Sequence, residues 1–238
     1  MNLFIISDIH GMYQQFEQLI KKWDMESKFV ILGDMVDRGP QSLHVIRKVM
    51  DLKRTYGQQV IVCKGNHEEM FLNYLSSPEA NKEFYFRNGG RQTMDSFLDQ
   101  LPSEMKTLNF TEQASIIKER FKEETSFLAE AELFVIVGDV LLTHAGFETQ
   151  YDNLDKSTED DFLWTRDHYL KENQTPYVNV FGHTPLKYIH EKDDVWMSEN
   201  GKFIGIDGGC CYGGQLNALF ISDKGEVLNT FYEKSSNT

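Results

Sequence analysis

The chain has 238 residues, and its 37 acidic side chains outnumber its 24 lysines and arginines, which gives a net charge of −13. Binding to the backbone of a nucleic acid needs clustered Lys and Arg, so this charge argues against DNA or RNA as a partner. No apolar run approaches the roughly 20 residues of a membrane helix, and the first residues do not resemble a secretion signal. We expect a globular cytoplasmic protein that binds neither nucleic acid nor membrane.

The first 75 residues alternate between short apolar runs and amphipathic stretches. The apolar runs 3–6, 29–32 and 60–62 predict buried strands. Residues 12–23 and 42–52 carry apolar side chains at helical spacing and predict helices. This βαβαβ order predicts a parallel sheet with right-handed crossovers.

Residues 76–130 have a different character, because they are polar and mainly helical, with Gly89–Gly90 as a break. Within them, residues 111–131 predict one helix. No linker composition marks off this segment. We therefore expect a single domain over residues 1–238 with a mainly helical insertion at about 76–130. The sequence does not say whether that insertion covers the functional site.

The second half of the chain is rich in predicted strands. Gly138–Asp139 is a two-residue hairpin signal between two apolar runs, and Lys224–Gly225 is a turn between the last two. The predicted strands are residues 133–137, 140–143, 178–181, 203–206, 218–222 and 227–232.

Polar side chains follow the predicted strands directly, where open α/β sheets bind their ligands. Four histidines lie at such positions, each within two residues of a glycine, and two aspartates and an asparagine join them. One such histidine is more often structural than functional, but seven such residues favour a metal site. A His/Asp/Asn set without cysteine suits manganese, iron or zinc. The residues are Asp8, His10, Asp34, Asn66, His67, His144 and His183.

Five short blocks carry these residues, and together they resemble the signature blocks of the calcineurin-like metallophosphoesterases. The form of the blocks is closest to the phosphoprotein phosphatase branch, which includes bacterial serine/threonine phosphatases and symmetrical diadenosine tetraphosphatases. Any one block is weak evidence, but five in order from residue 8 to about residue 213 are specific. The blocks are Asp8-Ile9-His10-Gly11, Gly33-Asp34-Met35-Val36-Asp37-Arg38-Gly39, Gly65-Asn66-His67-Glu68, Thr143-His144-Ala145-Gly146 and Gly182-His183-Thr184.

The resemblance implies an α/β fold, a four-layer αββα sandwich, with two divalent metal ions, of which manganese is our first expectation and iron or zinc the others. It places Asp34 between the two ions, because a shared carboxylate screens their repulsion. The ions would activate a hydroxide that attacks phosphorus, so no Cys or Ser nucleophile is expected. Carried over by position, the ligands of the first ion are Asp8, His10 and Asp34, and those of the second are Asp34, Asn66, His144 and His183.

The resemblance also assigns catalytic roles to four side chains. His67 would be the general acid, with Asp37 holding its tautomer. Arg38 and Arg166 would bind phosphate oxygens and balance charge in the transition state. Arg166 lies in Leu163-Trp164-Thr165-Arg166, which resembles the Trp-x-Arg block of the family.

Two substrate classes remain open. The first is phosphoserine or phosphothreonine in a phosphoprotein, hydrolysed as a phosphomonoester by a serine/threonine phosphatase. The alternative is a nucleotide polyphosphate such as diadenosine tetraphosphate, for which the insertion offers Phe84, Tyr85, Phe86, Arg87 and Arg91. A scaffold that has lost catalysis is disfavoured because every ligand is present, and a nuclease is disfavoured by the acidic charge.

Several weaker features adjoin these blocks. Residues 88–93 resemble a segment at the wall of the site in bacterial members, although a plain glycine turn explains them equally well. Gly208 stands where relatives usually have Thr, which puts substrate contacts in doubt. The adjacent thiols Cys210 and Cys211 do not form a disulfide framework, and their role, like the oligomeric state, stays open.

Overall fold

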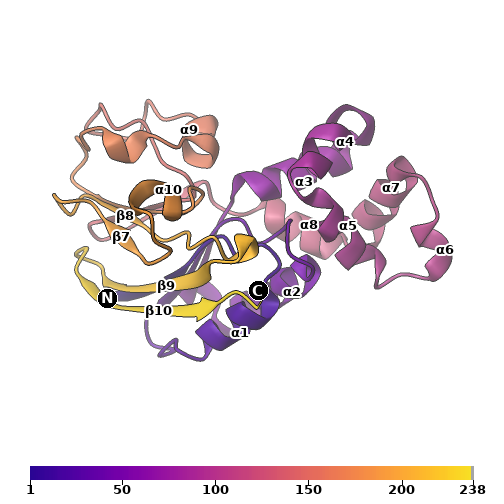
Figure 1. Cartoon of the computed structure of the whole chain (residues 1–238), viewed down its shortest axis with the longest axis horizontal. Helices are drawn as coiled ribbons and strands as arrows, with labels where there is room; N and C mark the ends of the chain where they lie inside the picture. Colours follow the sequence, from indigo (N-terminus) through magenta and orange to yellow (C-terminus); the bar gives the residue numbers. More distant parts are fainter. Residues whose placement is uncertain (237–238) are drawn as a thin grey trace.

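The computed structural model describes residues 1–236, which form two five-stranded β-sheets, with helices on both outer faces and in a lobe at one end (Figure 1). The first sheet has the strand order β10-β9-β1-β2-β3, and the second has the order β4-β5-β6-β8-β7. The strands of the first sheet are β1 (Asn2–Ile6), β2 (Lys28–Leu32), β3 (Val60–Cys63), β9 (Gln215–Ser222) and β10 (Val227–Lys234). Those of the second are β4 (Phe134–Val137), β5 (Val140–Thr143), β6 (Val178–Phe181), β7 (Trp196–Met197) and β8 (Phe203–Gly205).

The N-terminal βαβαβ prediction is confirmed. Strands β1, β2 and β3 pair in parallel, with Leu3 opposite Lys28 and Phe29 opposite Val60. Helices α1 (Tyr13–Ile20) and α2 (Ser42–Tyr56) form the two crossovers. Strand β9 adds to the other side of β1 in antiparallel fashion, and β10 follows β9 through the predicted turn at Lys224–Gly225.

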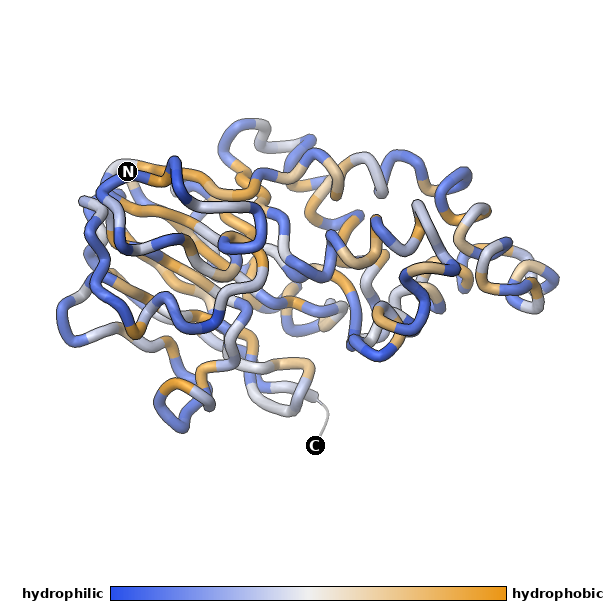
Figure 2. The backbone as a smooth tube through the Cα atoms, turned by 90° about the horizontal axis from the view of Figure 1, so that it is seen from above, coloured by the Kyte–Doolittle hydropathy of each residue, from blue (hydrophilic) through white to orange (hydrophobic). Residues whose placement is uncertain are grey.

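Alternation along β1 shows why the sheets stack. Phe4 and Ile6 pack with α1 and α2 in one apolar core, whereas Leu3 and Ile5 pack with the second sheet in another. A strand that is buried on both faces reads as a continuous apolar run, as residues 3–6 do. Figure 2 shows these apolar strands gathered in the interior of the sandwich, with hydrophilic loops around them.

The outer face of the second sheet is covered by a third core. Phe181 and Phe203 on that face pack with Phe162 of α9 (Glu159–Trp164). The short helix α10 (Lys187–His190) follows β6. The order helix, sheet, sheet, helix matches the four-layer αββα sandwich that the resemblance implied.

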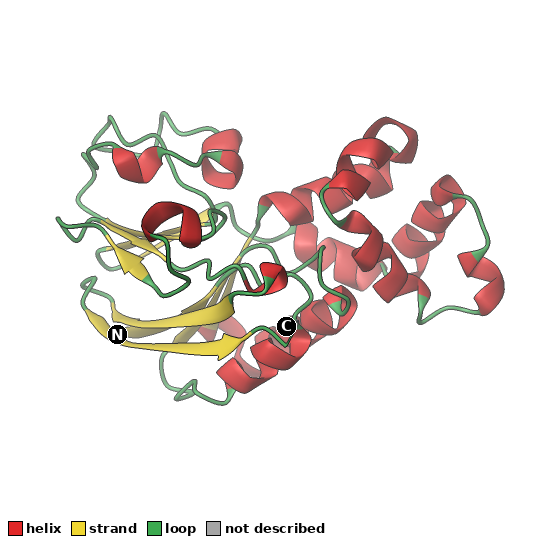
Figure 3. Ribbon diagram, viewed as in Figure 1, coloured by secondary structure: helices red, strands yellow, loops and turns green. Residues whose placement is uncertain are grey.

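Six helices, α3 to α8, form a lobe beside the sheets (Figure 3). One prediction was wrong here, because residues 111–131 form two helices rather than one. The break falls at Phe121, whose φ of −117° and ψ of 39° leave the helical region. Its ring packs on Phe97 with centroids 4.9 Å apart, so burial of the ring outweighs helix continuity. The helices are α3 (Asn66–Ser76), α4 (Pro78–Arg87), α5 (Gly90–Leu98), α6 (Ser103–Lys106), α7 (Phe110–Arg120) and α8 (Lys122–Ala129).

Within residues 1–236, no helix is long and apolar enough to cross a membrane.

Candidate metal centre

The loops after β1, β2, β3, β5 and β6 meet at one edge of the sandwich. The backbone itself joins them, because the His10 amide donates to the Asp34 carbonyl (2.8 Å) and the Gly182 amide donates to the His144 carbonyl (2.8 Å). All seven side chains singled out as ligands or acid are buried there. Residues up to 175 positions apart thus share one site.

Backbone strain concentrates at this edge. Within residues 1–236, eight residues other than glycine have positive φ, and six of them belong to the predicted site. Such conformations cost on the order of 1–3 kcal/mol each and persist where the surroundings enforce them. The six are Asp8, His10, Asp34, Asp37, Arg38 and His183.

The Asp34 carboxylate lies at the centre of the cluster. Its Oδ1 is 3.4 Å from His144 Nε2, and its Oδ2 is 3.4 Å from His10 Nε2. Each oxygen therefore faces a different histidine. This is the arrangement that a carboxylate shared between two ions requires.

Backbone carbonyls fix the tautomers of three histidines. The Nδ1–H groups of His10 and His144 donate to the carbonyls of Val36 (2.7 Å) and Leu32 (2.9 Å). Both Nε2 lone pairs are thereby directed at Asp34. His183 is reversed, because its Nε2–H donates to the Trp164 carbonyl (3.3 Å). Such partners orient the imidazoles that ligate metals.

Asn66 and Asp8 complete the cluster in different ways. Asn66 Oδ1 lies 3.0 Å from His144 Nε2. The Asp8 carboxylate accepts the His183 backbone amide at 3.0 and 3.1 Å, so it links the loop after β1 to the loop after β6. A side chain at Gly182 would collide with Asp8 Oδ2 at 2.2 Å, which explains the glycine there.

Two groups of three residues could each hold a metal ion, because the donor atoms within each group all lie within 4.8 Å of one another. The first group is His10, Asp34 and His67, and the second is Asp34, His144 and His183. The second set matches the predicted ligands. The first contains His67, predicted as the acid, and lacks the predicted ligand Asp8. Donor spacings of 3.0–3.4 Å match neighbouring ligands on one ion with bonds of about 2.1 Å.

The charge of the cluster also fits bound cations. Burial, and next the charge of Asp207, raises the pKa of Asp8 well above its usual value. Burial, and next the charge of Glu68, does the same to the pKa of Asp34. Burial and the nearby Arg38 lower the pKa of His10, which keeps the ring neutral as a ligand must be. Bound cations would supply the counter-charge that keeps these buried carboxylates ionised beside neutral imidazoles.

The predicted acid and its partner are in contact. His67 Nδ1–H donates to Asp37 Oδ2 at 2.7 Å, and within residues 1–236 its buried Nε2 has no hydrogen-bond partner. The other Asp37 oxygen accepts the hydroxyls of Tyr85 and Thr93, each at 2.8 Å. Burial raises the pKa of Asp37 to about 7, although both hydroxyls oppose this. Burial, and next the charge of Arg38, lowers the pKa of His67. The hydrogen bond to Asp37 favours the protonated ring when that carboxyl is ionised.

The helical lobe thus reaches the site through residues 85–93. Tyr85 lies on α4 and Thr93 on α5. The Gly89 carbonyl between these helices accepts the Arg38 amide at 3.0 Å. Residues 88–93 therefore lie against Asp37 and Arg38, two residues of the predicted site.

The two predicted arginines flank the cluster. Arg38 Nη1 contacts His10 Nε2, and within residues 1–236 no carboxylate lies within 4.0 Å of its guanidinium. Arg166 is exposed and donates from Nη1 to the His183 carbonyl at 3.0 Å. Neither arginine forms an ion pair with another side chain in the described part of the chain.

Glu68 was assigned no role from the sequence, although its block was noted. Its buried carboxylate accepts the backbone amides of Asp34 and Gly65 at 2.8 Å, and of Met35 at 2.7 Å. It therefore ties the loop after β2 to the start of α3. An acid at the third position of a helix signals such a cap.

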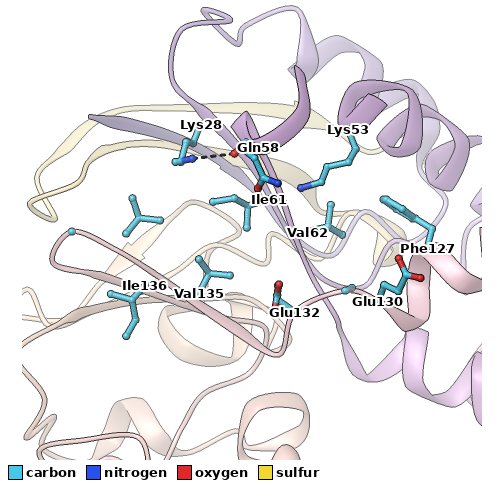
Figure 4. A pocket seen from close by; sticks show the side chains of 13 residues that line it. Lys28, Lys53, Gln58, Ile61, Val62, Phe127, Glu130, Glu132, Val135 and Ile136 are labelled. Atoms are coloured by element: carbon cyan, nitrogen blue, oxygen red, sulfur yellow. Dashed lines mark hydrogen bonds between the residues drawn. The ribbon is translucent and has the colours of Figure 1, made fainter. Parts of the chain in front are cut away.

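A separate cavity of about 620 Å³ lies along the side where β3 and β4 are edge strands (Figure 4). None of the predicted ligands lines it. Its two lysines bind the chain's own carbonyls: Lys28 donates to Gln58 (3.0 Å) and Lys53 to Val60 (2.6 Å).

Two sheets stacked between helices, with a buried His/Asp cluster at their carboxyl edge, define the fold and site of a metallophosphoesterase. The sequence profile of the calcineurin-like phosphoesterases matches residues 1–214, and the chain belongs to this family.

Two proteins that are similar in sequence are bis(5'-nucleosyl)-tetraphosphatases. The asymmetrical bis(5'-nucleosyl)-tetraphosphatase PrpE of Geobacillus sp. (strain WCH70) is 28% identical, over 92% of this chain and 90% of the relative. The symmetrical bis(5'-nucleosyl)-tetraphosphatase of Buchnera aphidicola subsp. Schizaphis graminum is 31% identical, over 64% of this chain and 47% of the relative.

Two solved structures share the fold. A candidate diadenosine tetraphosphatase superposes with a TM-score of 0.67 at 19% identity, over 100% of this chain and 95% of that one. A cold-active protein tyrosine phosphatase gives 0.64 at 19% identity, over 98% and 78%.

Proposed function

We propose that the protein is a hydrolase of nucleoside polyphosphates, with diadenosine tetraphosphate as its test substrate, and that it works with two divalent metal ions, manganese first among them. The placement of Asp34, with one oxygen toward each of two histidines, carries the reaction class. The substrate class rests on the bis(5'-nucleosyl)-tetraphosphatases that resemble this chain along most of both lengths.

In this proposal the metal ligands are the six buried residues of the cluster other than His67. Asp8, His10 and Asp34 hold one ion, and the second is held by Asp34 with the three donors Asn66, His144 and His183. When bound, the ions supply Lewis acidity and an activated water.

His67 is the proton donor to the leaving oxygen. Its Nε2 is buried next to Asp34 and has no partner within residues 1–236, so it is available to a substrate oxygen. Asp37 holds the ring by Nδ1 at 2.7 Å, which fixes the orientation of Nε2.

Arg38 and Arg166 bind the phosphate under attack. Both carry guanidinium groups that form no ion pair within residues 1–236, and they contact His10 and His183, one histidine from each ion site. Paired N–H donors match phosphate oxygens and stabilise the charge that grows in the transition state.

The competing substrate is phosphoserine or phosphothreonine in a protein, which the sequence first favoured. The same centre serves both reactions, and the structural likeness to protein phosphatases concerns the fold alone. The resemblance in sequence to nucleotide hydrolases decides our choice.

A direct comparison of the two substrates tests this choice. Protein stripped of metal and reloaded with Mn²⁺ would receive diadenosine tetraphosphate and a phosphoserine peptide in parallel assays. We expect kcat/KM to be more than tenfold higher for the nucleotide, a difference of about 1.4 kcal/mol. A tenfold preference for the peptide would overturn the nucleotide assignment, and chromatography of the products would show which anhydride bond is cut.

A further inference from the structure

An exposed group of rings and one free cation adjoins the metal centre on its Arg38 side. Lys187 and Tyr188 begin α10, and Tyr212 ends a short 3₁₀ turn, η3 (Cys210–Tyr212). Tyr212 is 53% exposed and Tyr188 is 73% exposed. None of these three residues has a role in the proposal above. We call this group the Lys187 patch.

The patch touches the centre through one side chain. The guanidinium of Arg38 lies over the Tyr212 ring, 5.1 Å from its centroid. The ammonium of Lys187 lies 5.4 Å from the same centroid and 5.1 Å from that of Tyr188. A cation and a ring thus alternate outward, from Arg38 beside His10 to Tyr188 at the surface.

Backbone contacts hold the two parts of the patch in register. The Leu186 amide donates to the Asp207 carbonyl at 2.9 Å, which joins the start of α10 to the loop that leads into η3. Gly209 and Gly213 bracket η3 with φ of 65° and 90°. The relative placement of Lys187 and Tyr212 is therefore built into the fold.

Apart from the two rings, Lys187 has no partner in the described part of the chain. Within residues 1–236 its ammonium forms no ion pair and no hydrogen bond, whereas Lys171 and Lys224 each bind a carboxylate. A chain with a net charge of −13 leaves this cation unpaired near its active centre. Compact ammonium groups bind phosphate as point charges.

A single phosphate does not account for these groups. In the proposed function, the phosphate under attack is already bound at the metal centre by Arg38 and Arg166. Lys187 and the two rings are surplus to it and lie beyond Arg38. Exposed aromatic faces can stack on nucleobases.

From this we infer that the Lys187 patch binds the far part of a dinucleoside polyphosphate: Lys187 holds a phosphate beyond the one attacked, and the rings of Tyr212 and Tyr188 stack on the nucleobase. This inference rests on the proposed function. It names the residues that distinguish a nucleotide from a small phosphomonoester at the same centre.

The test compares two substrates across matched variants in the manganese-loaded enzyme. Diadenosine tetraphosphate reads the whole site, and para-nitrophenyl phosphate reads the centre with a single phosphate. Lys187→Gln removes the outer cation. Lys224→Gln removes an exposed lysine on the β9–β10 turn and is its control.

For Lys187→Gln we expect kcat/KM to fall about tenfold further on the dinucleotide than on para-nitrophenyl phosphate, mainly through KM. For Tyr212→Leu we expect the same larger loss of kcat/KM on the dinucleotide. Tyr212→Phe should retain the dinucleotide activity because it keeps the ring. Equal losses on both substrates would mean that the variants act through Arg38 and would overturn the patch.

The two proposals fail in different ways. A wild type that hydrolyses para-nitrophenyl phosphate but not the dinucleotide contradicts the proposed substrate, and the patch with it. A wild type that hydrolyses the dinucleotide, with KM unchanged in Lys187→Gln and Tyr212→Leu, contradicts the patch alone.

Discussion

The carboxyl edge of the sheets and the helical lobe build the same centre by different means. At the sheet edge, every ligand follows a strand directly, and the backbone is strained at six site residues. The lobe begins with α3, whose first turn carries the ligand Asn66 and the acid His67. Its remaining helices carry none of the proposed ligands, yet their Tyr85 and Thr93 hold Asp37, which holds His67. The sheet edge therefore sets which chemistry is possible, whereas the lobe sets how precisely the acid is oriented.

The largest expected effect lies at the sheet edge. Asp34→Asn removes the carboxylate that faces both ion sites, so we expect kcat with saturating Mn²⁺ to fall at least about 1,000-fold, or about 4 kcal/mol. Steady-state kinetics measures this, with the exposed acid variant Asp139→Asn as control. Retention of more than a tenth of the activity by Asp34→Asn would remove Asp34 from the centre of the account.

Glu68 joins the two regions, because it ties the loop after β2 to the first helix of the lobe. Glu68→Gln places an amide N–H₂ among backbone donors, so we expect a loss of about 3 kcal/mol in the free energy of unfolding. Urea denaturation measures it, with the exposed Glu83→Gln as control. A loss equal to that of the control would mean that the loop does not depend on this carboxylate.

His168 is a buried histidine outside the proposed ion sites, and its ionisation provides a test of stability. Burial lowers its pKa to about 3, so between about pH 6.5 and pH 3 the unfolded chain binds a proton that the folded chain does not. The free energy of unfolding should therefore fall as pH falls, by about 2 kcal/mol from pH 7 to pH 5. Denaturation of His168→Asn should lack this part of the slope, whereas the exposed His44→Gln should keep it.

The smallest expected effect belongs to the lobe. Tyr85→Phe removes one hydrogen bond to Asp37 (2.8 Å), so we expect kcat to fall three- to tenfold, or about 1 kcal/mol, with KM little changed. Tyr74→Phe is the matched control, because its hydroxyl binds the Phe110 carbonyl in the same lobe. Equal rates for the two variants would show that the lobe does not act on the acid.

The contrast between the sheet edge and the lobe also explains which features could be predicted from the sequence. Strands such as 3–6 and 29–32, and the ligands after them, were readable because apolar runs and the polar residues that end them are local signals. Tyr85 was expected to face a nucleotide, but it is buried against Asp37. This contact was missed because Asp37 lies 48 positions away, and helical spacing says nothing of such a contact. The break at Phe121 was missed for the same reason, since packing on Phe97 decides it.

The central claim is that Asp34 is shared by two ions, and a count of bound metal tests it most directly. Metal-free protein would be titrated with Mn²⁺ and the bound metal measured per chain, for the wild type and for Asp34→Asn. We expect two ions per chain in the wild type and fewer than one at the same free Mn²⁺ in the variant. One ion in the wild type, or two in the variant, would contradict the account.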